Sequence, residues 1–381
     1  MRSCHDHLAE TIARAGGWIP FDQFMALALY APGVGYYEQA NPIGSLIAGG
    51  DFITAPELSR FFAGALARQL DEWFEDVARE VIEFGAGSGQ LAADLLLHFA
   101  QSGKPLQRYR IVEVSAQLRA RQHATLAREV PELLPCVQWL PQLPTRLEGV
   151  VLANELLDAM PVRLFVGDRG AVQERGVALD ANSQLVWADR AADEGLAGGV
   201  AQALKEAGWS ISDARTYQSE WPEQASAWVR TIAERLRQGV LLVLDYGFPR
   251  PEFYHRARHS GTLMCHRGHR SDPNPLLEVG QRDITAHVDF TAIARAASAG
   301  GLELIGYTSQ ARFLLNCGIL EALVASTPSA AQRSAVQLLL SEAEMGELFK
   351  VIAFADPAHR TQSTPLGFVR GDRSMMLTPT P

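Results

Sequence analysis

A glycine-rich turn is the segment whose residue types and spacing best suit ligand binding. It reads EFGAGSG over residues 83–89, between a predicted strand and a predicted helix. Glycines permit a tight turn and a close approach of the ligand, and the start of a helix offers free N–H groups. A dinucleotide site places its third glycine three residues after the second, whereas Gly89 follows Gly87 by two. Because the carboxylate of Glu83 suits a cation better than a pyrophosphate, we expect a cofactor with a cationic amino-acid moiety, such as S-adenosylmethionine.

A second acidic residue, Glu113, comes at the end of the next predicted strand, with Val114 beside it. In nucleotide-binding βαβ units an acid at this place hydrogen-bonds the ribose hydroxyls. Taken alone, the glycine turn is equally compatible with a plain connection between a strand and a helix. The combination of Glu83, the glycines and Glu113 favours a cofactor site.

Alternating strands and helices must position these residues. Short apolar runs predict strands at 81–84, 109–114, 137–140, 150–154 and 240–246, and helical stripes predict helices at 90–100 and 116–129. Continuous β-branched runs separated by helices indicate a parallel sheet covered on both faces, in an α/β fold. Such a sheet binds ligands beyond the carboxyl ends of its strands. Two later segments, 302–307 and 349–355, are expected to add an antiparallel hairpin to this sheet.

We expect a core with two additions. The core is predicted over residues 76–161 and 239–381, and an inserted subdomain over 162–238. Residues 1–75 are expected to hold helices and a loop rich in Gly, Pro and aromatic residues, the helices lying at 5–15, 21–30 and 57–75. The insertion is predicted to contain a hairpin of 172–179 with 185–189, then helices near 194–207 and 219–237. A further irregular stretch, 250–290, is dense in His, Arg, Pro and Gly.

Composition limits the class of protein. A net charge of -9 argues against bulk electrostatic binding of nucleic acid, so we expect no nucleic-acid partner. The cysteines are few and scattered, which is not typical of a disulfide framework and favours a reducing compartment. No apolar run approaches the ~18 residues that span a bilayer, and the first residues lack the pattern of a signal peptide. We therefore expect a cytoplasmic protein without membrane insertion.

Several separated motifs resemble those of the MidA-type methyltransferases, the family of a mitochondrial complex I assembly factor that methylates an arginine. They are GDFITAPELS (50–59), VIEFGAGSG (81–89), YRIVEVS (109–115), NELLDAMPV (154–162), LDYG (244–247), the GTL…HR stretch (261–270) and GQRDITAHVDF (280–290). The resemblance covers nearly the whole chain. It implies a class I, Rossmann-like methyltransferase fold with an added substrate-facing subdomain. It also implies S-adenosyl-L-methionine as cofactor, with S-adenosyl-L-homocysteine as product.

The resemblance also extends the candidate cofactor site. It implies that the loop containing Thr54 covers the cofactor, although Thr54 before Pro56 could simply start a helix. Family members often have proline where this chain has Ala86, and Leu140 stands where many methyltransferases have an acid toward adenine. The expected cofactor contacts are Glu83, Gly85, Ala86, Gly87, Gly89, Glu113, Val114, Thr54 and Asn154.

The segment NELLDAMPV follows the predicted strand 150–154, where the resemblance places an arginine substrate. Arginine is a poor nucleophile because its guanidinium is always charged and delocalised, and carboxylates can hold it bidentately. Glu155 is the first candidate for this clamp, with Asn154 and Asp158 beside it. Glu174 is a weaker candidate for a second carboxylate, and Asp158 could also be an ordinary solvated acid.

His287 is a candidate for taking the proton released by transfer, because histidine titrates near neutral pH. It is equally compatible with a packing role. The run His255, His259, Cys265, His266 and His269 matches no zinc pattern and is crowded by arginines, so we expect no metal site.

Two alternatives to a protein arginine methyltransferase stay open. One is a non-catalytic assembly factor that binds S-adenosylmethionine, and the other is a methyltransferase for a small molecule. We expect a protein substrate, with a respiratory complex I subunit or a bacterial equivalent as one candidate, and a homodimer as one candidate assembly.

Overall fold

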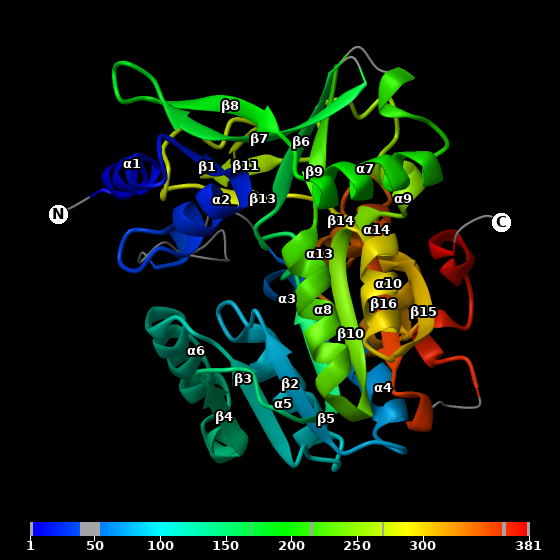
Figure 1. Cartoon of the computed structure of the whole chain (residues 1–381). Coiled ribbons are helices and arrows are strands. Elements are labelled where there is room, and N and C mark those ends of the chain that lie inside the picture. Colours follow the sequence, from blue (N-terminus) through cyan, green and yellow to red (C-terminus); the bar gives the residue numbers. More distant parts are fainter. Residues whose placement is uncertain are drawn as a thin grey trace.

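The computed structural model describes residues 3–38, 54–168, 170–213, 216–268, 270–359 and 363–378. Within them an eight-stranded sheet runs through the lower half of the view in Figure 1. Its order across the sheet is β15 (Glu303–Ser309), β16 (Phe349–Ala355), β10 (Leu236–Phe248), β5 (Leu147–Asn154), β2 (Glu80–Phe84), β3 (Arg108–Val112) and β4 (Val137–Leu140), with β14 (Val288–Asp289) beside β10.

The strand directions agree with the sheet that the resemblance implies. Strands β4, β3, β2, β5 and β10 pair in parallel. Strand β16 lies antiparallel to both β10 and β15, which confirms the predicted antiparallel hairpin. The predicted α/β class with a mainly parallel sheet is therefore confirmed.

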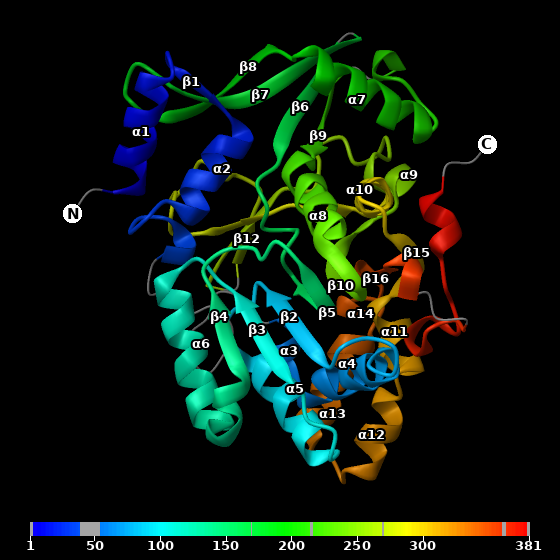
Figure 2. The ribbon, with the colours of Figure 1, turned by 60° about the horizontal axis from the view of Figure 1, so that its bottom comes forward.

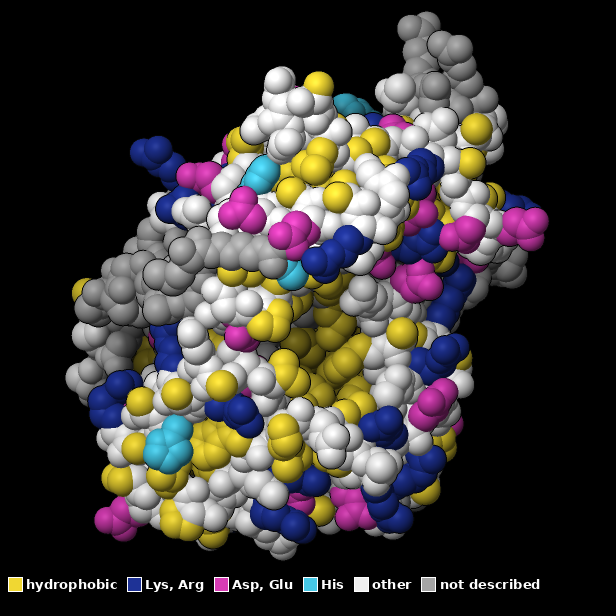
Figure 3. All heavy atoms as spheres, turned by 60° about the vertical axis from the view of Figure 1, so that its left-hand side comes forward, with side chains coloured by type: hydrophobic (Ala, Val, Ile, Leu, Met, Phe, Trp, Pro, Cys, Tyr) yellow, Lys and Arg dark blue, Asp and Glu magenta, His cyan; other side chains and the backbone are white. Residues whose placement is uncertain are grey.

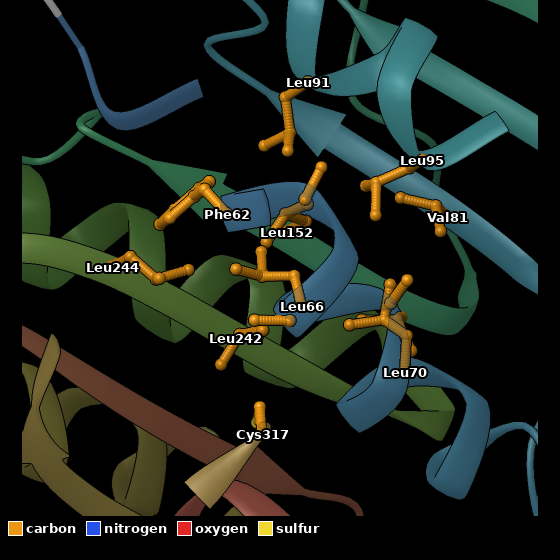
Figure 4. Packing of buried hydrophobic residues seen from close by; sticks show 14 of the residues in the cluster. Phe62, Leu66, Leu70, Val81, Leu91, Leu95, Leu152, Leu242, Leu244 and Cys317 are labelled. Atoms are coloured by element: carbon orange, nitrogen blue, oxygen red, sulfur yellow. The ribbon is translucent and has the colours of Figure 1, made fainter. Parts of the chain in front are cut away.

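Helices cover both faces of this sheet, because its strands are apolar on both sides. On one face the buried residues of the sheet pack with α4 (Arg60–Trp73), α5 (Gln90–Gln101), α6 (Ala116–Glu129), α11 (Gln310–Asn316), α12 (Ile319–Ala325) and α13 (Ala330–Leu340). Figure 4 shows Leu66 of α4 beside Leu152 and Leu242 of the sheet, and Leu70 of the same helix on the side of Val81. On the other face they pack with α8 (Glu223–Arg235) and α10 (Phe290–Ala299).

A second sheet lies above the core in Figures 1 and 2. It is five-stranded in the described residues and contains β1 (Trp18–Pro20), β7 (Ala171–Leu179), β6 (Arg163–Asp168), β9 (Thr216–Trp221) and β8 (Leu185–Ala191). Helices α1 (Cys4–Arg14) and α2 (Phe21–Tyr30) pack with β1, and α7 (Glu194–Glu206) packs with β6 and β9. The N-terminal segment therefore completes the sheet of the inserted segment.

Several predicted elements need correction. The predicted helix 57–75 is two helices, α3 (Ala55–Leu58) and α4, because extended backbone at Ser59 interrupts the turns and its hydroxyl caps α4. The helix predicted at 219–237 is shorter in the structure, where it is α8. Its predicted first residues belong to strand β9 and its predicted last residues to strand β10. The stretch 250–290, expected to be irregular, contains α9 (Arg250–Phe253) and a small sheet of β12 (Arg270–Asp272), β11 (Met264–Arg267) and β13 (Asp283–Thr285).

Candidate functional site

The glycine turn joins β2 to α5 through backbone conformations that glycine adopts without strain. Gly85, Gly87 and Gly89 have φ values of 70°, 50° and 85°. A Cβ added at Gly85 would lie 3.1 Å from the side chain of Leu156, and one at Gly89 would lie 3.1 Å from the backbone of Gln122. A Cβ at Gly87 would meet nothing within 4 Å among the described atoms. Gly87 therefore leaves the approach to the backbone open, while the other two glycines permit close packing.

Two buried carboxylates flank this turn. Glu83 on β2 accepts a hydrogen bond of 2.8 Å from the hydroxyl of Tyr109, and burial raises its pKa to about 7. Glu113, just after β3, accepts one of 2.9 Å from the Ser115 N–H and one of 3.1 Å from the Gln122 amide. Burial also raises the pKa of Glu113. Both side chains can accept further donors from a ligand.

Gln122 on α6 links the two parts of this region and was missed by sequence reasoning. Its Nε2 also donates to the Gly87 carbonyl at 3.3 Å, and its Oε1 accepts from the Trp139 indole at 3.0 Å. One amide thus connects the glycine turn, Glu113 and β4. The sequence offers no local signal for this role, because Gln122 occupies an ordinary position of an amphipathic helix.

The turn after β5 carries the second group of polar residues. Glu155 has φ 50°, which is uncommon for a residue other than glycine and places strain at this position. Its Oε1 accepts from the Ala55 N–H at 3.3 Å and from the Asn154 amide at 3.2 Å. Burial, followed by the charge of Asp158, raises the pKa of Glu155 to about 8. The Asn154 Oδ1 is buried without a partner in the described part of the chain.

A tyrosine of β10 holds the side chain of Asp158. Its Oδ2 accepts a hydrogen bond of 2.5 Å from the Tyr246 hydroxyl, and its buried Oδ1 has no partner among the described residues. Burial raises the pKa of Asp158 to about 6. Asp245, next to Tyr246, accepts hydrogen bonds from the backbone N–H groups of residues 156, 157 and 158 at 3.2, 2.8 and 3.3 Å.

These groups line one cavity of about 460 Å³ at the carboxyl ends of β2, β3 and β5. A hollow with a largely hydrophobic floor is visible on the face of the molecule shown in Figure 3. Of the predicted site residues, the structure places ten on the cavity wall: Thr54, Glu83, Gly85, Ala86, Gly87, Glu113, Val114, Asn154, Glu155 and Asp158. Gly89 starts α5 behind the wall, against Gln122.

The wall is acidic. Besides the predicted carboxylates it includes Glu38, Glu57 and Asp283, and no Lys or Arg among the described residues. The Ser88 hydroxyl donates to Glu57, which ties α3 to the glycine turn. Because a cavity with this balance of charge favours cationic ligands, it suits both a sulfonium with an ammonium group and a second cation.

Aromatic residues that the sequence did not single out for the site complete the wall. Tyr30 of α2 stacks on Tyr37 with ring centroids 5.4 Å apart, and their hydroxyls donate to the Ala159 carbonyl and to Asp283. Trp228 of α8 also lines the cavity and contacts the ring of Phe84. These residues come from distant segments, so their meeting could not be inferred from local spacing.

Two candidates lie elsewhere. His287 is outside the cavity wall, with its ring 5.2 Å from those of Tyr246 and Phe248, and burial lowers its pKa to about 4. Glu174 forms a bidentate pair with Arg163 in the second sheet. Residues 39–53 of the expected cofactor-covering loop lie outside the described residues, as does His269.

The described residues contain neither a metal-binding cluster nor a membrane-spanning helix. No group of His, Cys, Asp and Glu side chains there is arranged to hold a metal ion. No helix in the same residues has the length and apolar character needed to cross a bilayer.

Comparison with known proteins agrees with this geometry. Residues 65–308 match a family model described as S-adenosyl-L-methionine-dependent methyltransferase. A curated relative from Mus musculus, "Protein arginine methyltransferase NDUFAF7, mitochondrial", is 30% identical, with 89% of this chain and 81% of the relative covered. The Homo sapiens protein of the same name is 29% identical, with 92% and 82% covered.

A crystal structure of a Burkholderia thailandensis protein bound to S-adenosylhomocysteine is also similar. It is 46% identical, superimposes with a TM-score of 0.91, and the match covers 98% of this chain and 96% of that one. The carboxylate-flanked glycine turn, the strand order and these similarities agree, and the chain belongs to the MidA-type family of S-adenosyl-L-methionine-dependent methyltransferases.

Proposed function

We propose that this methyltransferase transfers the methyl group of S-adenosylmethionine to a guanidinium nitrogen of an arginine on a protein substrate. The observation that carries the arginine is the set of free acceptors after β5. Asn154 Oδ1 and Asp158 Oδ1 are buried without partners in the described residues, and no described donor reaches Glu155 Oε2. A guanidinium presents five N–H donors and no acceptor, so it is suited to fill such a set.

The cofactor end of the cavity fits the methyl donor. When bound, S-adenosylmethionine supplies an electrophilic methyl group on a sulfonium. Glu83 can hold the ammonium of its amino-acid part, and Glu113 can accept from the ribose hydroxyls. Gly87 leaves room beside the turn for this approach, because a Cβ there would face open space. Trp228 and Leu143 offer apolar surface for the adenine.

Glu155 and Asp158 are proposed to orient the guanidinium and concentrate electron density on one nitrogen. Transfer of a methyl cation leaves one proton to be removed from the guanidinium group. Glu155 is suited to accept it, because burial raises its pKa to about 8 and a base works best near the operating pH. His287 is a weaker candidate for this proton, because it lies outside the cavity wall.

The relatives support the substrate class. Those from Mus musculus and Homo sapiens are named protein arginine methyltransferases. The family resemblance adds a subunit of respiratory complex I or its bacterial equivalent as a substrate to test. A homodimer and a cytoplasmic location are likewise part of the proposal.

Calorimetry with S-adenosylmethionine and S-adenosylhomocysteine tests the cofactor site. We expect Gly87→Arg and Glu113→Ala to abolish binding that the wild type shows. Matched controls are Gly103→Arg, at another glycine with positive φ and open surroundings, and Glu132→Ala at an exposed glutamate. Equal binding by Glu113→Ala and wild type would remove Glu113 from the site.

Transfer from labelled S-adenosylmethionine to proteins of a cell extract tests the arginine. We expect methylated arginine in the hydrolysed protein fraction. Cofactor binding without transfer would favour a non-catalytic assembly factor, and label confined to small molecules would favour a small-molecule methyltransferase.

A further inference from the structure

The LDYG segment at the end of β10 contains two residues that contact the proposed guanidinium-binding turn in different ways. Asp245 accepts from three successive backbone N–H groups, those of residues 156–158. Tyr246 reaches a side chain of the same turn, Asp158. Because Asp245 already fixes the backbone, the hydroxyl of Tyr246 acts on side chains: it donates to the Asp158 carboxylate and interacts with the Thr285 side chain.

Each of the two acids in the turn has one oxygen bound by the protein. Glu155 Oε1 accepts from Ala55 and Asn154, and Asp158 Oδ2 accepts from Tyr246. Within the described residues the hydrogen bonds of Glu155 are made through Oε1, which leaves Oε2 without a donor there, and Asp158 Oδ1 is buried without one. The bound oxygens thus determine where the free oxygens point.

We propose that Tyr246 is a positioning residue, whose hydroxyl holds Asp158 at the cavity wall so that its second oxygen, buried and unpartnered among the described residues, is left to complete, with Glu155, a two-carboxylate clamp for the substrate cation. This inference rests on the proposed arginine substrate. Tyr246 does not itself line the cavity, and it acts through Asp158.

The ring of Tyr246 is held independently of its hydroxyl. It packs edge-on against His287 and Phe349, with both ring centroids 5.2 Å away. Tyr246→Phe should therefore keep the packing and remove only the hydroxyl, with its hydrogen bond to Asp158 and its interaction with the Thr285 side chain. Through this contact His287 supports the ring of Tyr246, which is a structural role.

Removing that hydroxyl should change the titration of Asp158. A donor to a carboxylate stabilises the charged form, so its loss raises the pKa of the carboxyl. The titratable groups that surround Asp158 are Tyr246 and Asp245 of β10, Glu155 of its own turn, Tyr30 of α2, Tyr37 of the short helix Tyr36–Glu38 and Asp283 of β13. Since the substitution changes only one of them, the comparison with wild type isolates its effect.

The test uses the full chain saturated with S-adenosylhomocysteine and ethylguanidinium as the probe. We expect Tyr246→Phe to bind the probe about tenfold more weakly, the loss of one charge-assisted hydrogen bond, with unchanged affinity for S-adenosylhomocysteine. The ¹³C carboxyl signal of Asp158, assigned with Asp158→Asn, should titrate at higher pH than in wild type. Tyr254→Phe is the matched control, because this buried hydroxyl donates to the distant Glu220 carbonyl.

A double-mutant cycle separates positioning from a general loss of structure. If Tyr246 acts through Asp158, adding Tyr246→Phe to Asp158→Asn should weaken probe binding no further. Equal probe affinity and equal titration in Tyr246→Phe and wild type would overturn the inference, as would additive losses in the cycle. Failure of the arginine proposal would be visible in the wild type alone, as normal binding of S-adenosylhomocysteine with no binding of ethylguanidinium.

Discussion

Individual acids in the cavity are buried, and no Lys or Arg of the described residues lines the cavity beside them. Burial raises the pKa of Glu83 to about 7, of Asp158 to about 6 and of Glu155 to about 8. A bound cation favours the ionised form of such groups. These carboxyl groups are therefore expected to lose protons when a cationic ligand binds. Binding of such a ligand then depends on pH.

Replacing Glu155 by Gln tests its role in transfer. The substitution keeps the size of the side chain and removes its charge, so we expect kcat/KM for an arginine substrate to fall on the order of 100-fold, as for other preorganised electrostatic contacts. Affinity for S-adenosylhomocysteine should stay within about twofold, since Glu155 is proposed to contact the other ligand. Steady-state methylation and calorimetry give the two values, and Glu132→Gln at the surface is the control. A normal rate in Glu155→Gln would remove it from the mechanism.

The same substitution should change stability with pH in the ligand-free protein. The pKa of Glu155 is about 8 in the folded chain against 4.5 for an unperturbed glutamate. Its protonated form therefore adds stability that is fully present below pH 4.5 and is lost as pH rises to 8. We expect wild type to lose stability relative to Glu155→Gln over this interval, so that the variant is the more stable at pH 8.5. Urea unfolding at both ends of the interval checks this, and a constant difference would contradict it.

The sequence alone predicted those site residues that lie at or just after the ends of strands. Glu83, Glu113 and Glu155 stand at the ends of three apolar runs, and parallel strands bring their carboxyl ends to one edge. Asp283 and Trp228 also line the cavity, but they come from β13 and α8. Their arrival depends on long-range packing, which local spacing does not encode.

At the scale of elements, α6 supports the cofactor site through Gln122. This side chain does not itself line the cavity. Losing its bonds to Gly87 and Glu113 should leave both less well fixed. We expect Gln122→Ala to weaken binding of S-adenosylhomocysteine about tenfold, the size of one or two lost hydrogen bonds. Calorimetry measures the change, with Gln117→Ala on the exposed side of the same helix as control. Unchanged affinity would show that the turn keeps its shape without this amide.

The accuracy of the predicted elements followed the clarity of their patterns. Apolar core strands such as β2 and β5 were predicted because burial on both faces leaves continuous apolar runs. Strand β9, TYQSEW, was missed because its buried positions include Ser219 and Glu220. Glu220 accepts from the N–H groups of Thr262 and Leu263 in the loop 260–263, and the Ser219 hydroxyl donates to Glu220. Its partner β6 was missed as well.

At the scale of the whole molecule, a net charge of -9 and an acidic cavity act together on charged ligands. S-adenosylmethionine carries one more positive charge than S-adenosylhomocysteine. Raising salt from about 20 to about 300 mM shortens the screening length several-fold and should weaken binding of the methyl donor more than binding of the product. Calorimetry of both ligands at the two salt concentrations measures the difference. Equal salt dependence would show that the cavity does not respond to the extra charge.

The position of β16 has a consequence for synthesis on the ribosome. This strand, at residues 349–355, lies between β10 and β15 although it follows both in the chain. While it is still inside the exit tunnel, β10 presents an unpaired apolar edge, the kind of surface that promotes aggregation. The eight-stranded sheet therefore cannot finish folding while the chain is being translated. A premature stop before residue 349 should yield a chain for chaperones and proteases rather than a shortened enzyme.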